Sequence, residues 1–271
     1  MNLYEASCWY FNRSQSALKR GLVLSAVLLI LTLTTLWSLS DAEDAFLVVV
    51  IGLAQLWLMW SKYRALYWFG KGDEPRRMYQ LQVGLGVAPS AERCARIEAE
   101  VGVCNQPIDP TYWLSKKTPS PRRMIEMLLE SSFYTRSLAL KCRNLFMWIG
   151  LAGLSLSLIT LIVAYRTRTS DRPNALVAHI VITVFVFFLT GDFWIICLLY
   201  NDLFKSADDS HKHAYQILQQ TEITHDQALE IAMDYNTAVV QAPPLLSSRH
   251  LSSKSQLDVL FRRSYSELLG I

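Results

Sequence analysis

The side chains between residues 208 and 213 have the types that bind metal ions or transfer protons. They are Asp208, Asp209, His211 and His213. Asp209 and His213 are four residues apart and share a face of a helix, whereas His211 and His213 point in different directions. A structural transition-metal site needs several ligands that converge on one point. We therefore interpret this stretch as a solvated helical face and predict no metal site.

The remaining reactive residue types form no motif that is typical of an enzyme. The five cysteines are odd in number and include no C-x-x-C pair, which favours reduced, structural thiols. The glycines of Gly70-Lys71-Gly72 and Gly84-Leu85-Gly86 lack the spacing of a phosphate-binding loop. Neither H-E-x-x-H nor G-x-S-x-G occurs. We predict a noncatalytic protein without a catalytic residue or a cofactor.

One carboxylate, that of Asp192, lies within a long apolar segment. Four such segments contain this single formal charge between them: Gly21–Ser40, Ala45–Trp60, Leu145–Tyr165 and Leu176–Tyr200. About 20 helical residues cross the hydrocarbon core of a bilayer, and the 16 residues of Ala45–Trp60 can cross it if flanking cations reach the headgroups. Of all 271 residues, 52% are hydrophobic and 18% are charged, which argues against a purely soluble fold. We predict an all-α membrane protein with four transmembrane helices in two hairpins and a helical cytoplasmic domain.

A charge inside a bilayer is costly, so Asp192 should face other helices or water. Gln55 lies at a similar predicted depth, and a Gln55–Asp192 contact is our hypothesis. Ser25, Thr32 and Thr35 add a sparse polar stripe on the first span. Two interpretations remain open: these groups line a path for water or ions, or they form a satisfied polar network that holds the bundle together.

Small residues recur along the third predicted span at spacings of three and four. They are Gly150, Gly153, Ser157, Thr160 and Ala164. This spacing places them on one seam, along which another helix can approach closely. The seam either packs within the monomer or mediates self-association.

The distribution of basic residues predicts the orientation. Residues 62–143 contain 14 Lys and Arg against 8 Asp and Glu, whereas the short turn at Asp41–Asp44 contains only acids. The second outer turn, which contains Arg166, Arg168 and Arg172, opposes this orientation but carries fewer charges. By the excess of cations on the cytoplasmic side we expect a multi-pass protein of the bacterial inner membrane with both termini in the cytoplasm. A cleaved signal peptide is the alternative interpretation of the first segment. The predicted divisions are an N-terminal arm (1–20), transmembrane hairpin 1 (21–61), a cytoplasmic helical domain (62–143), transmembrane hairpin 2 (144–200) and a cytoplasmic helical tail (201–271).

The predicted cytoplasmic parts contain several helix boundaries. Ser90 is placed to cap a helix through Val101, and Gly102 follows in the position of a left-handed C-terminal residue. Ser120-Pro121 begins a helix over 121–143 that continues into the third span. Residues 201–220 should likewise continue the fourth span, and the residues from 102 to 121 should form a loop.

Thr224 and Gln227 form the pattern of a capping box, in which each side chain satisfies the other residue's backbone N–H. The helix behind it should bury a stripe made of Ala228, Ile231, Ala232, Tyr235, Ala238, Val239 and Ala242. Pro243-Pro244 should end this helix, and an amphipathic segment over Gln256–Leu269 follows.

A set of cations in the central segment are candidates for contact with anionic lipid or phosphate. They are Arg76, Arg77, Arg93, Arg96, Lys116, Lys117, Arg122 and Arg123. The same charges also serve as an ordinary topology signal, which is the simpler interpretation.

Two helical pairs with a cytoplasmic domain between them and a helical tail resemble the bacterial S-4TM class of four-span proteins. The residues that carry the resemblance are the helix Ala91–Glu98, the loop with Pro107 and Trp113, and Asp234-Tyr235-Asn236 leading to Pro243-Pro244. The resemblance implies a membrane effector of anti-phage systems that oligomerises and permeabilises the inner membrane when triggered. No ligand-binding residue is carried over from the class.

We therefore expect a noncatalytic membrane effector that senses a cytosolic trigger. The expected partners are the lipid bilayer, further copies of the chain, and a nucleotide second messenger or a cytosolic protein, but no nucleic acid. The alternative is a membrane scaffold or accessory subunit that recruits a cytosolic partner through its 224–271 helices.

Overall fold

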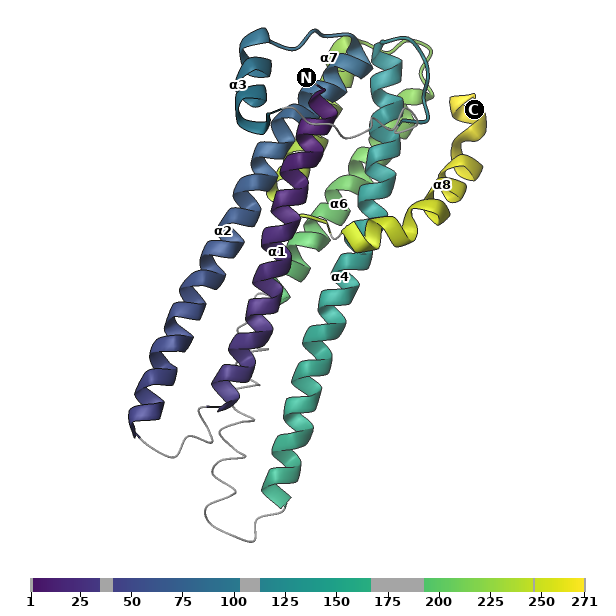
Figure 1. The fold of residues 1–271 in the computed structure, drawn as a ribbon. Helices are drawn as coiled ribbons and strands as arrows, with labels where there is room; N and C mark the ends of the chain where they lie inside the picture. Colours follow the sequence, from purple (N-terminus) through teal and green to yellow (C-terminus); the bar gives the residue numbers. More distant parts are fainter. Residues whose placement is uncertain (1, 35–40, 103–112, 167–192, 246, 271) are drawn as a thin grey trace. The chain divides into compact units, whose positions relative to one another are not determined.

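The computed structural model describes residues 2–34, 41–102, 113–166, 193–245 and 247–270. Within these ranges it contains seven α-helices and no strand, which confirms the all-α class (Figure 1). The helices are α1 (Leu3–Thr34), α2 (Asp41–Leu85), α3 (Ala91–Val101), α4 (Pro121–Arg166), α6 (Phe193–Leu218), α7 (His225–Gln241) and α8 (Ser247–Leu269). Judged on the described residues, none of these helices is both long enough and apolar enough for a membrane span.

The chain forms two compact units that share four of the helices. Unit 1 comprises residues 1–15, 66–142 and 199–271, and unit 2 comprises residues 16–65 and 143–198. The helices α1, α2, α4 and α6 each pass from one unit to the other without a break in the helix.

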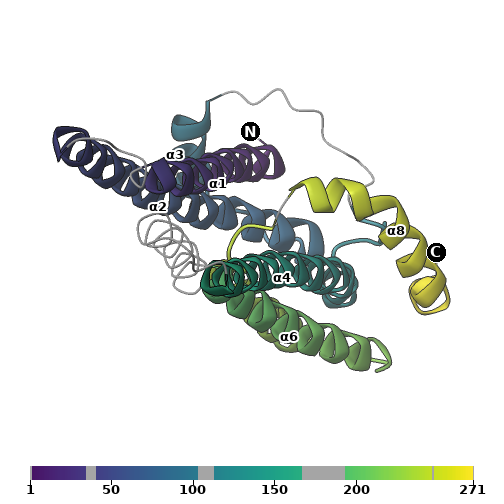
Figure 2. The same cartoon turned by 90° about the horizontal axis from the view of Figure 1, so that it is seen from below.

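Unit 1 has a hydrophobic core built mainly from α4, α6, α7 and α8. It buries apolar side chains such as Leu128, Ile217, Ile231 and Phe261. Figure 2, a view from below, shows α4 and α6 side by side, as their shared core residues require. A second cluster joins α3 to the unit 1 parts of α1 and α2. Ion pairs reinforce this junction, with 2.6 Å between Lys71 Nζ and Glu100 Oε1.

Two glycines on α2 permit close approach of neighbouring helices in unit 1. A Cβ atom at Gly72 would lie 2.8 Å from the Phe11 ring on α1. At Gly84 it would lie 3.2 Å from the Met124 Cα on α4. These glycines belong to the two Gly-x-Gly stretches of the sequence, and helix packing explains why a larger residue does not stand there.

Several predicted boundaries are confirmed. The Thr224–Gln227 capping box is present, with 3.0 Å from the Thr224 N–H to Gln227 Oε1 and 3.3 Å for the reciprocal bond. The helix α7 ends directly before Ala242 and Pro243-Pro244, and Gly102 follows α3 with a φ of 72°. The helix α4 begins at Pro121 and continues well past Arg143.

Two boundary predictions were wrong, and a third was right in position but not in its capping bond. Asp41–Asp44 forms the first turn of α2 rather than a turn between helices, because carboxylates are favourable at the positive end of a helix. The last helix begins at Ser247 rather than Gln256, since no Gly or Pro interrupts the intervening residues. Ser90 occupies the N-cap position of α3, but its side chain makes no capping hydrogen bond.

In unit 2, α1 approaches α2 at Gly21, where an added Cβ would lie 3.7 Å from Leu58. Near Gly150 on α4 the ring of Trp194 on α6 lies 3.2 Å from an added Cβ. Among the described residues of this unit, large apolar side chains are exposed on α1, α2, α4 and α6, including Val23, Leu53, Trp148 and Ile195.

Candidate binding cavity

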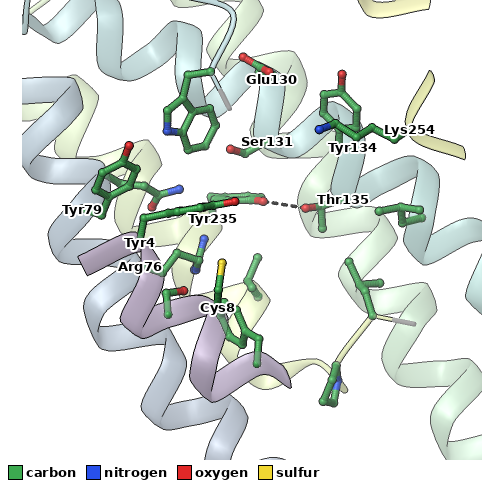
Figure 3. A pocket seen from close by; sticks show the side chains of 18 of the residues that line it. Tyr4, Cys8, Arg76, Tyr79, Glu130, Ser131, Tyr134, Thr135, Tyr235 and Lys254 are labelled. Atoms are coloured by element: carbon green, nitrogen blue, oxygen red, sulfur yellow. Dashed lines mark hydrogen bonds between the residues drawn. The ribbon is translucent and has the colours of Figure 1, made fainter. Parts of the chain in front are cut away.

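A cavity of about 520 Å³ lies within unit 1. Its wall is formed by α1, α2, α4, α7 and α8, together with Leu203 of α6, the Trp113-Leu114 segment and the Pro243-Pro244 segment (Figure 3). A volume of this size accommodates a small organic ligand. The lining mixes aromatic rings with a few charged and amide side chains, which is the composition typical of a binding site.

The helix α4 contributes a continuous polar face to this cavity. Its lining residues are Glu130, Ser131, Tyr134, Thr135 and Leu138, whose spacing places them on one side of a helix. Thr135 Oγ1 and the Tyr235 hydroxyl of α7 are hydrogen-bonded at 2.7 Å, as the dashed line in Figure 3 shows. This bond fixes the Tyr235 ring as one wall of the cavity.

The guanidinium of Arg76 on α2 is held by neighbouring polar groups. It donates from Nε to Asp73 Oδ1 at 3.0 Å and from Nη2 to Asn236 Oδ1 at 2.8 Å. Its charged end lies over the Tyr235 ring, 6.0 Å from the ring centre. Asp73 is 4% exposed, so the Arg76 charge is compensated by a buried carboxylate. Arg76 therefore orients the cavity wall more than it attracts an anion.

Glu130 has no such compensation. Its side chain is buried and accepts a hydrogen bond at Oε2 from the Leu114 N–H, at 3.0 Å. Burial raises the pKa of Glu130 to about 7; the Leu114 bond opposes this shift, and the nearby charge of Asp258 adds to it. Near neutral pH the cavity thus contains a carboxyl group that is poised between its two protonation states.

Gln80 on α2 also lines the cavity and is only 2% exposed. Its Oε1 atom is buried and has no hydrogen-bond partner among the described residues. A buried acceptor without a donor costs about 1–3 kcal/mol, so such a group in a native cavity requires an explanation. A donor on a bound molecule would satisfy it.

The helix α8 contributes charged residues to the cavity wall. The Tyr134 hydroxyl donates a hydrogen bond to Asp258, and Lys254 and Arg262 line the same side with exposed side chains. Burial, followed by this bond, raises the pKa of Tyr134 far above its usual range, so the phenol stays protonated. Tyr134 is therefore a fixed donor to Asp258.

His211 belongs to a different, fully packed part of unit 1. It is 4% exposed, which makes the predicted solvated face wrong at this residue. Its Nδ1 lies 3.2 Å from both Leu129 O and Ser132 Oγ, and its Nε2 lies 2.6 Å from the Tyr265 hydroxyl. Burial lowers the pKa of His211 to about 4, so the ring is neutral and links α4, α6 and α8. Among the described residues, no cluster of three or more His, Cys, Asp or Glu could hold a metal ion.

Most of the predicted lipid- or phosphate-contacting cations have carboxylate partners in unit 1. Arg77 pairs with Asp73, as Arg76 does, and Arg96 Nη2 lies 2.6 Å from Glu74 Oε1. The cations of Lys117 and Arg122 both pair with the buried Glu126. Arg93 and Lys116 are exposed, and Arg123 is half-buried. Five of the eight cations are therefore paired with carboxylates of the protein itself.

The predicted features of the apolar segments are described only in part. Asp192 and Thr35 lie outside the described residues, as do the side chains of Thr32, Ser157, Thr160 and Ala164. Gln55 is exposed, and the Ser25 hydroxyl donates to the Gly21 carbonyl at 3.0 Å. Gly150 and Gly153 are buried. The Gln55–Asp192 contact stays a hypothesis.

Sequence reasoning missed the cavity, because its residues come from segments as distant as Tyr4 and Lys254. A local signal did exist for the burial of His211. It belongs to a stripe with Leu203, Ala207, Ala214 and Leu218, at helical spacings of three and four, and all of these are buried.

No protein-family model matches the chain, and no curated protein sequence or solved structure shows significant similarity to it.

Proposed function

We propose that the protein is a noncatalytic membrane effector, in which unit 1 senses a cytosolic trigger and unit 2 rearranges or oligomerises in the bilayer. The observation that carries this proposal is the continuity of α1, α2 and α4 from a cavity-bearing unit into a unit with exposed apolar side chains. The activity proposed is permeabilisation of the bacterial inner membrane in anti-phage defence, which is what the resemblance to the S-4TM class implies.

Exposed apolar side chains support a lipid environment for unit 2. On α2, Leu53 is 63% exposed and Leu56 and Trp57 are each 64% exposed. Comparable residues are exposed on α1, α4 and α6, for example Val23, Ile159 and Leu198. Large exposed apolar surfaces mark contact with membranes or with other proteins. Together with the four long apolar segments of the sequence, which contain one charge between them, these residues support four membrane spans. The excess of basic residues in 62–143 supports an orientation with both termini in the cytoplasm.

The continuous helices connect the cavity in unit 1 to the part of the protein that is proposed to rearrange in unit 2. Tyr4 on α1, Arg76 on α2 and Glu130 on α4 all line the cavity, and each stands on a helix that continues into unit 2. A ligand that favours one spacing of these helices in unit 1 shifts the population of helix arrangements beyond it. The trigger in this scheme is a small molecule, such as a nucleotide second messenger, or a cytosolic protein.

The experiment is inducible expression in bacteria with a membrane-potential dye, with and without phage infection. We expect depolarisation that depends on the infection signal, and none from cells that express the Leu53→Asp variant, in which a charge disrupts the apolar segment. Depolarisation that is absent in infected cells, despite a stable protein in the membrane fraction, would contradict the proposal. So would a purified chain that remains monodisperse without detergent.

The alternative is a membrane scaffold that recruits a cytosolic partner. Exposed apolar side chains on the two C-terminal helices favour it, namely Leu229 and Met233 on α7 and Val259 and Leu260 on α8. Aspartate at Met233 and Leu260 should then abolish capture of the partner without any change in membrane potential. Captured partner that is unaffected by both substitutions would exclude these helices as the docking surface.

A further inference from the structure

Two buried acceptors that line the unit 1 cavity, on Gln80 and Glu130, have capacity for further donors. Gln80 Oε1 is buried without a partner, and Glu130 accepts one hydrogen bond, at Oε2. Both side chains are more than nine-tenths buried, at 2% and 6% exposure. Within the described residues Glu130 forms no ion pair, unlike Glu126 one turn earlier on α4, which pairs with Lys117 and Arg122.

The cations that line the cavity do not meet this need. Arg76 already donates to Asp73 and Asn236. Lys254 and Arg262 are exposed side chains of α8. Arg262 and Lys116 act on Glu130 only through their charge, and they are outweighed by the burial of the carboxyl group. The two buried acceptors therefore suit a ligand that carries N–H donors, and the Glu130 carboxylate favours a cationic one.

Aromatic rings surround these acceptors. Tyr4, Tyr79, Tyr134 and Tyr235 line the same cavity from α1, α2, α4 and α7 (Figure 3). Tyrosine faces attract organic cations and pack against flat apolar groups. The wall thus suits a ligand whose charged end carries several N–H groups and whose body is flat.

We propose that this cavity binds a small organic cation of the amidine, guanidine or amine class, with N–H groups donated to Glu130 and to Gln80 Oε1 and a flat body between the tyrosines. This inference names the ligand class for the sensing site, and it rests on the proposed function only for the consequence of binding. Binding itself is a property of unit 1 and is tested separately.

Three probes of nearly equal size and shape test the assignment against the purified full-length chain. Benzamidine is a cation with N–H donors, benzamide is neutral with N–H donors, and benzoate is an anion without them. The three affinities are measured by isothermal titration calorimetry at about pH 7.5, where most Glu130 carboxyl groups are ionised because their pKa is about 7. We expect benzamidine to bind at least about tenfold more tightly than benzoate, with benzamide between them. Equal affinities, or tighter binding of benzoate, would overturn the proposal.

Variants assign the contacts. Glu130→Gln keeps the shape but removes the charge, and it should weaken benzamidine about tenfold or more while changing benzamide little. Gln80→Met removes the amide acceptor and should weaken both probes severalfold. Glu230→Gln, an exposed site on α7 outside the cavity lining, is the matched control and should change neither affinity. Unchanged benzamidine affinity in Glu130→Gln would exclude the assignment.

A proton count distinguishes a ligand contact from a merely structural role of Glu130. At about pH 6 most Glu130 carboxyl groups are protonated in the free protein, given a pKa of about 7. A bound cation requires the ionised form, so titrations in buffers of different ionisation enthalpy should show release of about one proton. Asp258, Lys116 and Arg262 face the same carboxyl group and remain in every variant. Release that persists in Glu130→Gln would contradict the assignment.

The two proposals fail in different ways. Specific benzamidine binding without any membrane depolarisation in infected cells would retain the cavity assignment and refute the effector function. Infection-dependent depolarisation by a protein that binds none of the three probes would retain the effector function and refute the cavity assignment.

Discussion

The helix α4 carries large apolar side chains in both units, but their exposed fractions differ between the two units. In unit 1, Met124 is 1% exposed and Ile125 and Leu129 are fully buried. In unit 2, Trp148 is 66% exposed and Ile159 is 58% exposed. Because one unbroken helix contains both sets, local helix propensity does not account for the difference. In unit 1 the buried residues of α4 pack against side chains of α6, α7 and α8.

Polar groups complete the contrast. Unit 1 buries ionisable side chains and gives several of them specific partners, as with Asp73 and Arg76, or His211 and Tyr265. Unit 2 leaves bulky apolar side chains on its outside. Buried and paired polar groups are typical of a protein core that surrounds a ligand site. Exposed bulky apolar side chains are typical of a surface that contacts lipid or the apolar face of another subunit. This difference between the two units is testable.

The strongest test places the same charge on an exposed leucine in each unit. Leu53 on α2 in unit 2 is 63% exposed, and Leu260 on α8 in unit 1 is 51% exposed. If lipid surrounds unit 2, Leu53→Asp costs about 3 kcal/mol of insertion free energy and removes most of the chain from the carbonate-resistant membrane fraction. Leu260→Asp should leave this fraction unchanged. Equal amounts of the two variants in the carbonate-resistant membrane fraction would show that the two leucines do not differ in environment.

Two buried titratable groups give unit 1 opposing pH dependences. The folded protein has a His211 pKa of about 4, below the ordinary 6.5, and a Glu130 pKa of about 7, above the ordinary 4.5. Between pH 4 and 6.5 the unfolded chain binds more protons at His211, so this group makes stability rise with pH. Between pH 4.5 and 7 the folded chain holds more protons at Glu130, so stability falls with pH.

Each contribution amounts to on the order of 3 kcal/mol and they nearly cancel from pH 4.5 to 6.5. Glu130→Gln should therefore steepen the rise of unfolding free energy with pH, relative to the wild type. His211→Gln should shift the same slope in the opposite direction. Denaturant titrations followed by hydrogen exchange of unit 1 amides measure both. Identical pH profiles for the wild type and both variants would show that neither group is buried as described.

Local patterns predicted the helix ends better than the environment of individual side chains. The Thr224 capping box and the stop before Pro243 depend on residues within a few positions, and both are present. The cavity depends on Gln80 of α2 and Glu130 of α4 lining the same space, and no spacing along the chain encodes that arrangement. The prediction of an exposed His211 was wrong because it rested on the nearby polar residues alone. His211 belongs to an apolar stripe of α6, and this stripe explains its burial.

Helix packing supplies a smaller difference between the units. An added Cβ at Gly84 in unit 1 meets the Met124 backbone at 3.2 Å, whereas one at Gly150 in unit 2 meets the edge of the Trp194 ring at the same distance. Backbone yields less than a side-chain ring, so Gly84→Ala should destabilise the protein by about 1–3 kcal/mol. Gly150→Ala should be nearly neutral, because better helix propensity offsets the ring movement.

Gly70→Ala is the control for helix propensity alone. It lies on α2 in unit 1, nothing lies within 4 Å of its added Cβ, and the change should stabilise the protein by about 0.5–1 kcal/mol. Thermal unfolding in detergent ranks the three variants. If Gly150→Ala is as damaging as Gly84→Ala, the helices of unit 2 are packed as rigidly as those of unit 1, and the proposed rearrangement loses its support.

The smallest expected effect concerns how far unit 1 depends on its helix caps. Thr224 accepts a hydrogen bond from the Gln227 N–H, whereas Ser90 occupies an equivalent position before α3 without any such bond. Thr224→Ala should therefore cost about 1 kcal/mol and Ser90→Ala only a few tenths. The exchange rates of the first amides of α7 and α3 measure each loss locally. A larger loss at α3 than at α7 would mean that the Ser90 side chain caps its helix in solution.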